Sequence, residues 1–172
     1  IWTPVDFNMI SYDQQGEFTP AVTPPYSPGG GPAAAFFTAT EEGYYQVNAR
    51  TNFLLIDPEI MEEIHFPNYP GFVSIAIVKT DIAGTTVMYA QGNKLQGADN
   101  NSAGGWNDLQ NNLAPNVSDV VHLLPGETIE IWVWQDLWST GLPLETGPRA
   151  DPGFQGPVPM PSQTYVSIHK SS

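Results

Sequence analysis

The sequence predicts an all-β, antiparallel sandwich of about eight to ten short strands, at the spacing typical of sandwiches and jelly rolls. Its 17 Pro and 16 Gly residues interrupt the chain too often for long helices. The expected strands show an alternation of apolar and polar residues, which is the pattern of half-buried strands. Because the pattern contains no crossover helices, a parallel α/β architecture is excluded.

We expect residues 1–172 to form a single domain, because this length suffices to bury a core without metal or disulfide support. Hydrophobic residues make up 41% of the chain, which is too many for a disordered segment. There is no cysteine, so the composition says nothing of the redox compartment. Since the chain starts at Ile1, we expect a processed or trimmed fragment, the C-terminal head of a longer chain.

The chain is strongly acidic, with 18 acidic and 5 basic residues and a formal net charge of -13. Such a chain repels phosphate backbones, so we expect no nucleic-acid partner. No run approaches the ~20 apolar residues that cross a bilayer, so we expect no membrane insertion. Charged residues are only 13% of the chain, and a surface rich in Asn, Gln, Ser, Thr and Gly is common in proteins of an extracellular, cell-surface or virion location.

The first half of the chain holds two clear strand candidates. An N-terminal stretch alternates only weakly, and the Pro- and Gly-rich residues 20–32 predict a loop. Residues 35–40 and 44–53 then form two strands around a turn at 41–43. The second strand alternates cleanly, which predicts one buried face.

A single helical turn is expected at 58–64, where Pro58 suits the first helical position and acidic residues suit the first turn. Residues 72–79 and 85–91 then predict a hairpin around Asp81-Ile82-Ala83-Gly84.

The second half of the chain repeats the pattern of strands and loops. Residues 117–124 and 128–135 are expected to pair across Pro125-Gly126. Long loops are expected at 97–115 and 137–161. Residues 163–172 read as a closing strand, which we expect in the interior of a sheet.

Three segments match motifs of a known family in the right order. Residues 36–47 contain a "Phe, small, Gly-x-Tyr" pair of strands, residues 121–131 a hairpin of the type Leu-x-x-Gly-Asp-x-hydrophobic-x-hydrophobic, and residues 165–168 a closing strand. Together they resemble the tumour-necrosis-factor and complement-head superfamily, with Glu127 where aspartate is usual. The long loops at 20–32 and 137–161 depart from the family, which puts any one member's ligand in doubt.

The resemblance implies a ten-stranded jelly roll that assembles as a homotrimer, with one sheet of each subunit facing the threefold axis. It places the strands at 44–50, 120–124 and 165–169 in that inner sheet. The core-facing residues are then Tyr45, Val47, Val121, Leu123, Val166 and Ile168. The opposite face is the expected trimer interface and carries Gln46, Asn48, Arg50, Val120, His122, Tyr165, Ser167 and His169.

Two of the three histidines, His122 and His169, fall on the expected axial face. One hypothesis is a pH-sensitive or metal-holding axis, because histidine titrates near neutral pH. The alternative is ordinary hydrogen bonding to Asn48, Tyr165 or the backbone.

A cluster of tryptophans alternates with aliphatic residues in the strand at 128–135. If the aliphatic residues fill the core, the rings project outward, where large aromatic groups mark a contact surface. The alternative is that the loop 137–161 covers them as a second small core. The candidate binding residues for a protein or sugar are Trp132, Trp134, Asp136 and Trp138.

We expect no metal site or other cofactor, although two oxygen-rich clusters carry the kind of ligands that Ca²⁺ takes. Neither has the spacing of an EF-hand, so both are read as solvated loops. The clusters are Asp57, Glu59, Glu62, Glu63 and His65, and Asp99, Asn100, Asn101 and Asp108.

The sequence contains no motif of a nucleophile elbow, a zinc-type histidine pair or a phosphate-binding loop, so we expect that it is not an enzyme. The function that we expect is a trimeric head for receptor or glycan binding on a phage, viral or bacterial spike, fibre or surface protein. A structural virion jelly roll, with a role in capsid or vertex assembly, is one alternative. A carbohydrate-binding module or carbohydrate-active enzyme is the other, because two carboxylates are all that a glycosidase needs.

Overall fold

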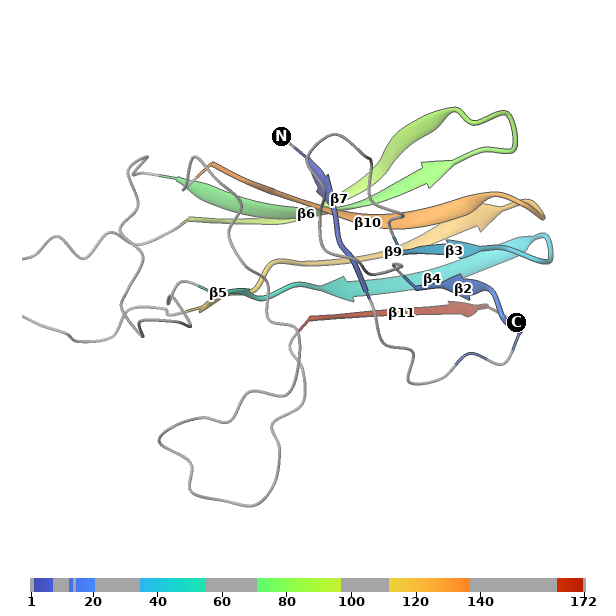
Figure 1. Cartoon of the computed structure of the whole chain (residues 1–172), viewed down its shortest axis with the longest axis horizontal. Coiled ribbons are helices and arrows are strands. Elements are labelled where there is room, and N and C mark those ends of the chain that lie inside the picture. The colour runs from blue at the N-terminus through green and yellow to red at the C-terminus, as the bar shows by residue number, and fades with distance from the viewer. Residues whose placement is uncertain are drawn as a thin grey trace, which may run out of the picture.

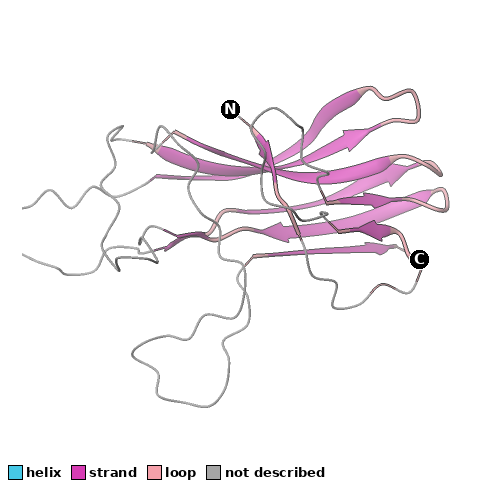
Figure 2. Ribbon diagram, viewed as in Figure 1, coloured by secondary structure: helices cyan, strands magenta, loops and turns pink. Residues whose placement is uncertain are grey.

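Figure 1 shows the computed structural model of the chain, which describes residues 2–7, 13, 15–20, 35–54, 71–96, 112–136 and 164–171. Within these ranges the secondary structure consists of strands and contains no helix (Figure 2). The expected helical turn at 58–64 lies outside them. No helix in the part of the chain described is long and apolar enough to cross a membrane.

The described residues form eleven strands, one more than the upper end of the expected range, and four of them are only two residues long. They are β1 (Thr3–Pro4), β2 (Phe18–Thr19), β3 (Phe36–Thr38), β4 (Gly43–Arg50), β5 (Phe53–Leu54), β6 (Phe72–Thr80), β7 (Thr86–Gln96), β8 (Asn112–Leu113), β9 (Asn116–Leu123), β10 (Thr128–Gln135) and β11 (Tyr165–Lys170).

The strands form two main sheets, with antiparallel pairing throughout. A six-stranded sheet has the order β2-β3-β10-β6-β7, with β1 also paired to β10. A three-stranded sheet has the order β11-β4-β9, and β5 and β8 form a separate pair. The two main sheets overlap in the view of Figure 1, and the architecture is a jelly-roll sandwich.

The core lies between the two sheets and is built from the apolar side of each alternating strand. From the six-stranded sheet come Ile75 and Ile77 of β6 and Ile129 and Ile131 of β10. The three-stranded sheet contributes the residues predicted to face the core. Four of these, Tyr45, Val47, Val121 and Leu123, are buried, and Val166 and Ile168 are partly buried against them.

Two turns carry the chain from one sheet to the other, and this corrects the expected pairing of the strands at 117–124 and 128–135. β9 pairs with β4, whereas β10 pairs with β1, β3 and β6 in the opposite sheet. The turn after β3 crosses in the same way into β4. The two turns bind each other, since Gly126 N donates to Ala39 O (2.8 Å) and Ala39 N donates to Glu127 O (3.0 Å).

The hairpin between β6 and β7 is confirmed. Asp81 holds its turn, because its Oδ1 accepts from Ala83 N (2.9 Å) and Thr85 N (2.8 Å). Gly84 follows with a φ of +83°, which favours glycine. The hairpin extends beyond the body of the sandwich in Figure 1.

The closing strand β11 is not where the sequence predicted it. Among the described strands it pairs only with β4, so it stands at one end of the three-stranded sheet and not in its interior. The register is fixed over its whole length, from Tyr165 opposite Arg50 to Lys170 opposite Tyr45.

Candidate functional site

The outer face of the three-stranded sheet carries all eight residues that the sequence assigns to a trimer interface. Register sets them in rows across β9, β4 and β11. One row joins Val120, Gln46 and His169, and the next joins Ser118, Asn48 and Ser167. Arg50 lies opposite Tyr165, and His122 lies opposite Tyr44. Sequence reasoning did not include Ser118 or Tyr44, although the same period of two places them on this face.

Exposed apolar side chains are present on this face. Tyr44 is 58% exposed, Val120 42% and Tyr165 47%, which is unusual for large apolar residues in well-formed strands. Tyr44 and Val120 lie toward one end of the face and Tyr165 at the other. Exposed hydrophobic residues on one face mark interaction surfaces. Three more, Val87, Met88 and Tyr89, lie on β7, and Tyr89 reaches β9 through a hydrogen bond from its hydroxyl to Val120 O (3.3 Å).

The middle of the face is a polar network that is closed within the subunit. Gln46 Nε2 donates to Ser118 Oγ (3.1 Å) and to Asn48 Oδ1 (3.3 Å), and Ser118 Oγ donates to Asn48 Oδ1 (2.7 Å). These hydrogen bonds join the side chains of β4 to that of Ser118 on β9.

The two histidines of the face have different surroundings. His122 Nε2 lies 3.5 Å from Glu42 Oε1, and its ring centroid is 5.0 Å from that of Tyr44. His169 lies opposite Gln46 on β11, so β4 separates the two histidines. The described residues contain no group of three or more His, Cys, Asp or Glu residues that could hold a metal ion. A role for either histidine at a threefold axis stays a prediction.

The tryptophans lie on the outer face of the six-stranded sheet, as their alternation with the buried aliphatic residues of β10 predicts. Trp132 and Trp134 are half-buried, however, and do not project freely. Register puts them beside Ala76 and Ser74 of β6, which are fully buried although they face away from the core. The large indole rings therefore cover small residues of the neighbouring strand.

Contacts at the end of this sheet involve further aromatic and charged groups. Trp2 lies against Trp134 with ring centroids 6.4 Å apart. Lys94 Nζ on β7 is 4.1 Å from the ring centroid of Phe72 and 5.1 Å from that of Trp134. Sequence reasoning missed Trp2, Phe72 and Lys94, because only the pairing of β6 with β7 and β10, and of β1 with β10, brings them together.

The polar partners in this region are also engaged. Trp132 Nε1 donates to Glu130 Oε2 (2.7 Å). The candidate binding residue Asp136 accepts a hydrogen bond from Phe72 N (2.5 Å) and so fastens the end of β10 to β6. Trp138 lies outside the described residues, as do both oxygen-rich clusters that were considered for Ca²⁺.

No protein-family model and no curated protein sequence matches the chain. Among solved structures, the Eiger tumour necrosis factor of S. frugiperda is 9% identical, with a TM-score of 0.47 over 80% of this chain. The chain spans 64% of that structure's length. The globular domain of zebrafish complement 1qA is 15% identical, with a TM-score of 0.44 over 96% of this chain and 80% of its own. The sheet order and burial pattern of this chain define an all-β antiparallel jelly-roll sandwich.

Proposed function

We propose that residues 1–172 are a non-enzymatic head domain of a longer chain, which assembles as a homotrimer and binds a protein or glycan receptor. The trimer is formed through the outer face of the three-stranded sheet. The observation that carries the proposal is the presence of exposed apolar residues on this face, with Tyr44 and Val120 toward one end and Tyr165 at the other.

The charge of the face supports the proposal. The chain carries a net charge of -13, so copies of it repel one another, and the repulsion is least where the contact surface is poor in acids. Every residue that register places on the outer face of the three-stranded sheet is neutral, basic or a histidine. Asp119 of β9 is exposed between Ser118 and Val120, although its register with Val47 assigns it to the other face. Glu41 and Glu42 lie in the turn before β4, where they pair with Lys170 and His122.

The exposed residues of β7 support a ring rather than a two-fold pair. Val87, Met88 and Tyr89 are exposed apolar residues of β7, at the edge of the six-stranded sheet, and Tyr89 reaches Val120 of the three-stranded sheet by a hydrogen bond (3.3 Å). Two different surfaces on one subunit suit a head-to-tail contact, which closes into a ring when the rotation between subunits is right. A two-fold dimer needs only one surface.

Receptor binding would then fall to the surfaces that the trimer leaves outside, which include the outer face of the six-stranded sheet with Trp132, Trp134 and Asp136. The setting that suits such a head is a spike, fibre or surface protein of a phage, virus or bacterium, outside the cell or on a virion.

The test is the solution mass of the purified domain by light scattering. A mass three times the 18.7 kDa of the chain is the expected result. A stable monomer at high micromolar concentration would overturn the trimer, and a dimer would overturn the head-to-tail arrangement. The same purified sample, immobilised and exposed to an array of glycans and to host cells, tests binding: the head binds in isolation, whereas a capsid protein with a role in assembly alone does not.

A further inference from the structure

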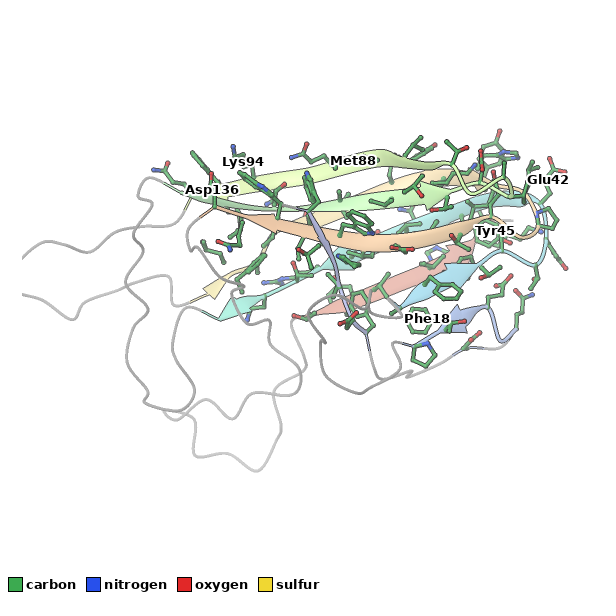
Figure 3. The ribbon with its side chains drawn as sticks, turned by 45° about the horizontal axis from the view of Figure 1, so that its top comes forward. Phe18, Glu42, Tyr45, Met88, Lys94 and Asp136 are labelled. Carbon is green, nitrogen blue, oxygen red and sulfur yellow. The ribbon has the colours of Figure 1, made fainter. Side chains whose placement is uncertain are left out.

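One exposed cation of the six-stranded sheet lies on aromatic rings. Lys94 on β7 is opposite Ser74 of β6, and Ser74 is opposite Trp134 of β10, so the three residues form one row across the sheet. The middle residue is small, and the lysine ammonium reaches within 5.1 Å of the Trp134 ring centroid. Figure 3 shows Lys94 and Asp136 at the same end of this sheet.

Lys94 differs from the other lysines of the described residues in its partners. Lys79 and Lys170 each form an ion pair with a carboxylate at 2.6 Å. Within the described part of the chain, Lys94 has no carboxylate at ion-pair distance, and its ammonium is placed over Phe72 and Trp134. The cation–π contacts hold the charge in position. An ammonium has three donors, and the side that points to solvent stays open to a ligand.

The chemistry of this cluster fits an acidic sugar. The carboxylate of such a sugar forms a charge-assisted hydrogen bond with an ammonium, and the apolar face of a pyranose ring stacks on flat aromatic rings such as those of Trp2 and Trp134. A neutral sugar makes no use of the cation. A polyanion such as nucleic acid is repelled by the net charge of -13, whereas a single carboxylate meets the local positive charge of Lys94.

We propose that Lys94, together with Phe72, Trp134 and Trp2, forms a subsite for the carboxylate-bearing sugar of an acidic glycan. This inference rests on the glycan-receptor part of the proposed function and names its ligand class. It does not depend on the trimer, because all four residues belong to one subunit and to one end of one sheet.

The experiment uses the whole chain and two matched pairs of probes. Methyl β-glucuronide and methyl β-glucoside differ only in the carboxylate, and sialyllactose and lactose differ only in the acidic sugar. Each is titrated by calorimetry and by the NMR signals of the indole N–H groups. We expect at least one acidic probe to bind and to shift the indole signals, with its neutral counterpart at least about tenfold weaker.

Three variants identify the cation that is responsible. Lys94→Met keeps the apolar stem on the rings and removes the charge. We expect it to weaken the binding of the acidic probe by about tenfold or more. Lys94→Arg keeps the charge and restores binding. Lys170→Met removes a cation at the other sheet and leaves binding unchanged. Circular dichroism confirms that each variant is folded.

The inference is overturned if neither acidic probe binds at millimolar concentration, if the neutral sugars bind equally well, or if Lys94→Met binds like the wild type. Light scattering on the same samples separates the two proposals. If the protein is a monomer that binds the acidic sugar, this inference stands and the proposed trimer is overturned. If the protein is a trimer that binds no acidic sugar, the proposed trimer stands and this inference is overturned.

Discussion

Lys79 on β6 and Glu127, the residue before β10, form an ion pair with an Nζ–Oε2 distance of 2.6 Å. Their side chains are only 18% and 6% exposed. The same ammonium donates to His122 O (3.0 Å), and the same carboxylate oxygen accepts from Leu124 N (2.7 Å). The pair therefore ties the six-stranded sheet to the turn through which the chain leaves the three-stranded sheet.

We predict that Lys79→Met destabilises the fold by about 3 kcal/mol at neutral pH, because it leaves the buried carboxylate of Glu127 without a counter-ion. Burial alone would raise the pKa of Glu127, but the Lys79 ammonium and the Leu124 N–H outweigh it and hold the pKa below its ordinary 4.5. A lowered pKa contributes stability that is present above pH 4.5 and is lost as the pH falls through the folded-state value. In urea denaturation, the difference between wild type and variant should therefore shrink below pH 4.5.

Lys170→Met is the matched control for this prediction. Lys170 and Glu41 are also 2.6 Å apart, but the pair is exposed to solvent, where ion pairs contribute little. We expect no measurable change in the urea midpoint. Equal losses in the two variants would contradict the role assigned to burial at Lys79.

The faces of the three-stranded sheet could be predicted from sequence, because a period of two fixes which residues share a face. Tyr45 and Val47 are buried and Val120 and Tyr165 exposed, as that period requires. The connections could not be predicted in the same way. Pro125-Gly126 suits a hairpin as well as a turn between sheets, and both arrangements bury the same apolar face.

The outer face of the six-stranded sheet shows the limit of sequence reasoning more clearly. Alternation places Trp134 away from the core, but it cannot say what lies beside the ring. That depends on the pairing of Trp134 with Ser74 and of Ser74 with Lys94, and each pairing is between strands far apart in the sequence. The same holds for His122, whose neighbour Glu42 comes from a turn at the end of another strand.

We predict that Trp132→Ala lowers the stability of the domain by about 2 kcal/mol, less than a fully buried tryptophan would, because the ring is half-buried. Its loss exposes Ala76, which is completely buried in the intact domain, and frees Glu130 from its hydrogen bond to the indole. The measurement is thermal unfolding followed by circular dichroism. A variant as stable as the wild type would show that the ring is a free platform for a ligand and does not cover the sheet.

We predict that Val120→Glu dissociates the proposed trimer without unfolding the subunit. Val120 is 42% exposed in the subunit, so a charge there is solvated in the monomer. In the trimer it adds three acids to the contact surface, beside the exposed Asp119 of each subunit, and the like charges repel. Light scattering should give the monomer mass with an unchanged circular dichroism spectrum. Gln15→Glu adds the same charge at an exposed turn and should leave the mass as it is.

The close approach of β7 to β9 gives the last prediction. A Cβ atom on Gly92 would collide with the backbone carbonyl of Asn116 and would lie 2.8 Å from Ile75 Cγ2. The same two strands are joined by a hydrogen bond from Asn116 N to Asn93 Oδ1 (2.6 Å), so neither backbone moves freely. Gly92→Ala must therefore separate the edges of the two sheets. We expect the free energy of unfolding, measured by urea denaturation, to fall by about 2 kcal/mol.

Gly43→Ala tests whether the rigidity of the obstacle decides this loss. The added Cβ atom there would lie 2.5 Å from Lys170 Cε, at the far end of a flexible side chain that moves aside. We expect the Gly43 variant to lose much less stability than the Gly92 variant, because a side chain adapts where a backbone carbonyl does not. If the two variants lose the same amount, the contact between β7 and β9 is not what holds the edges of the sheets together.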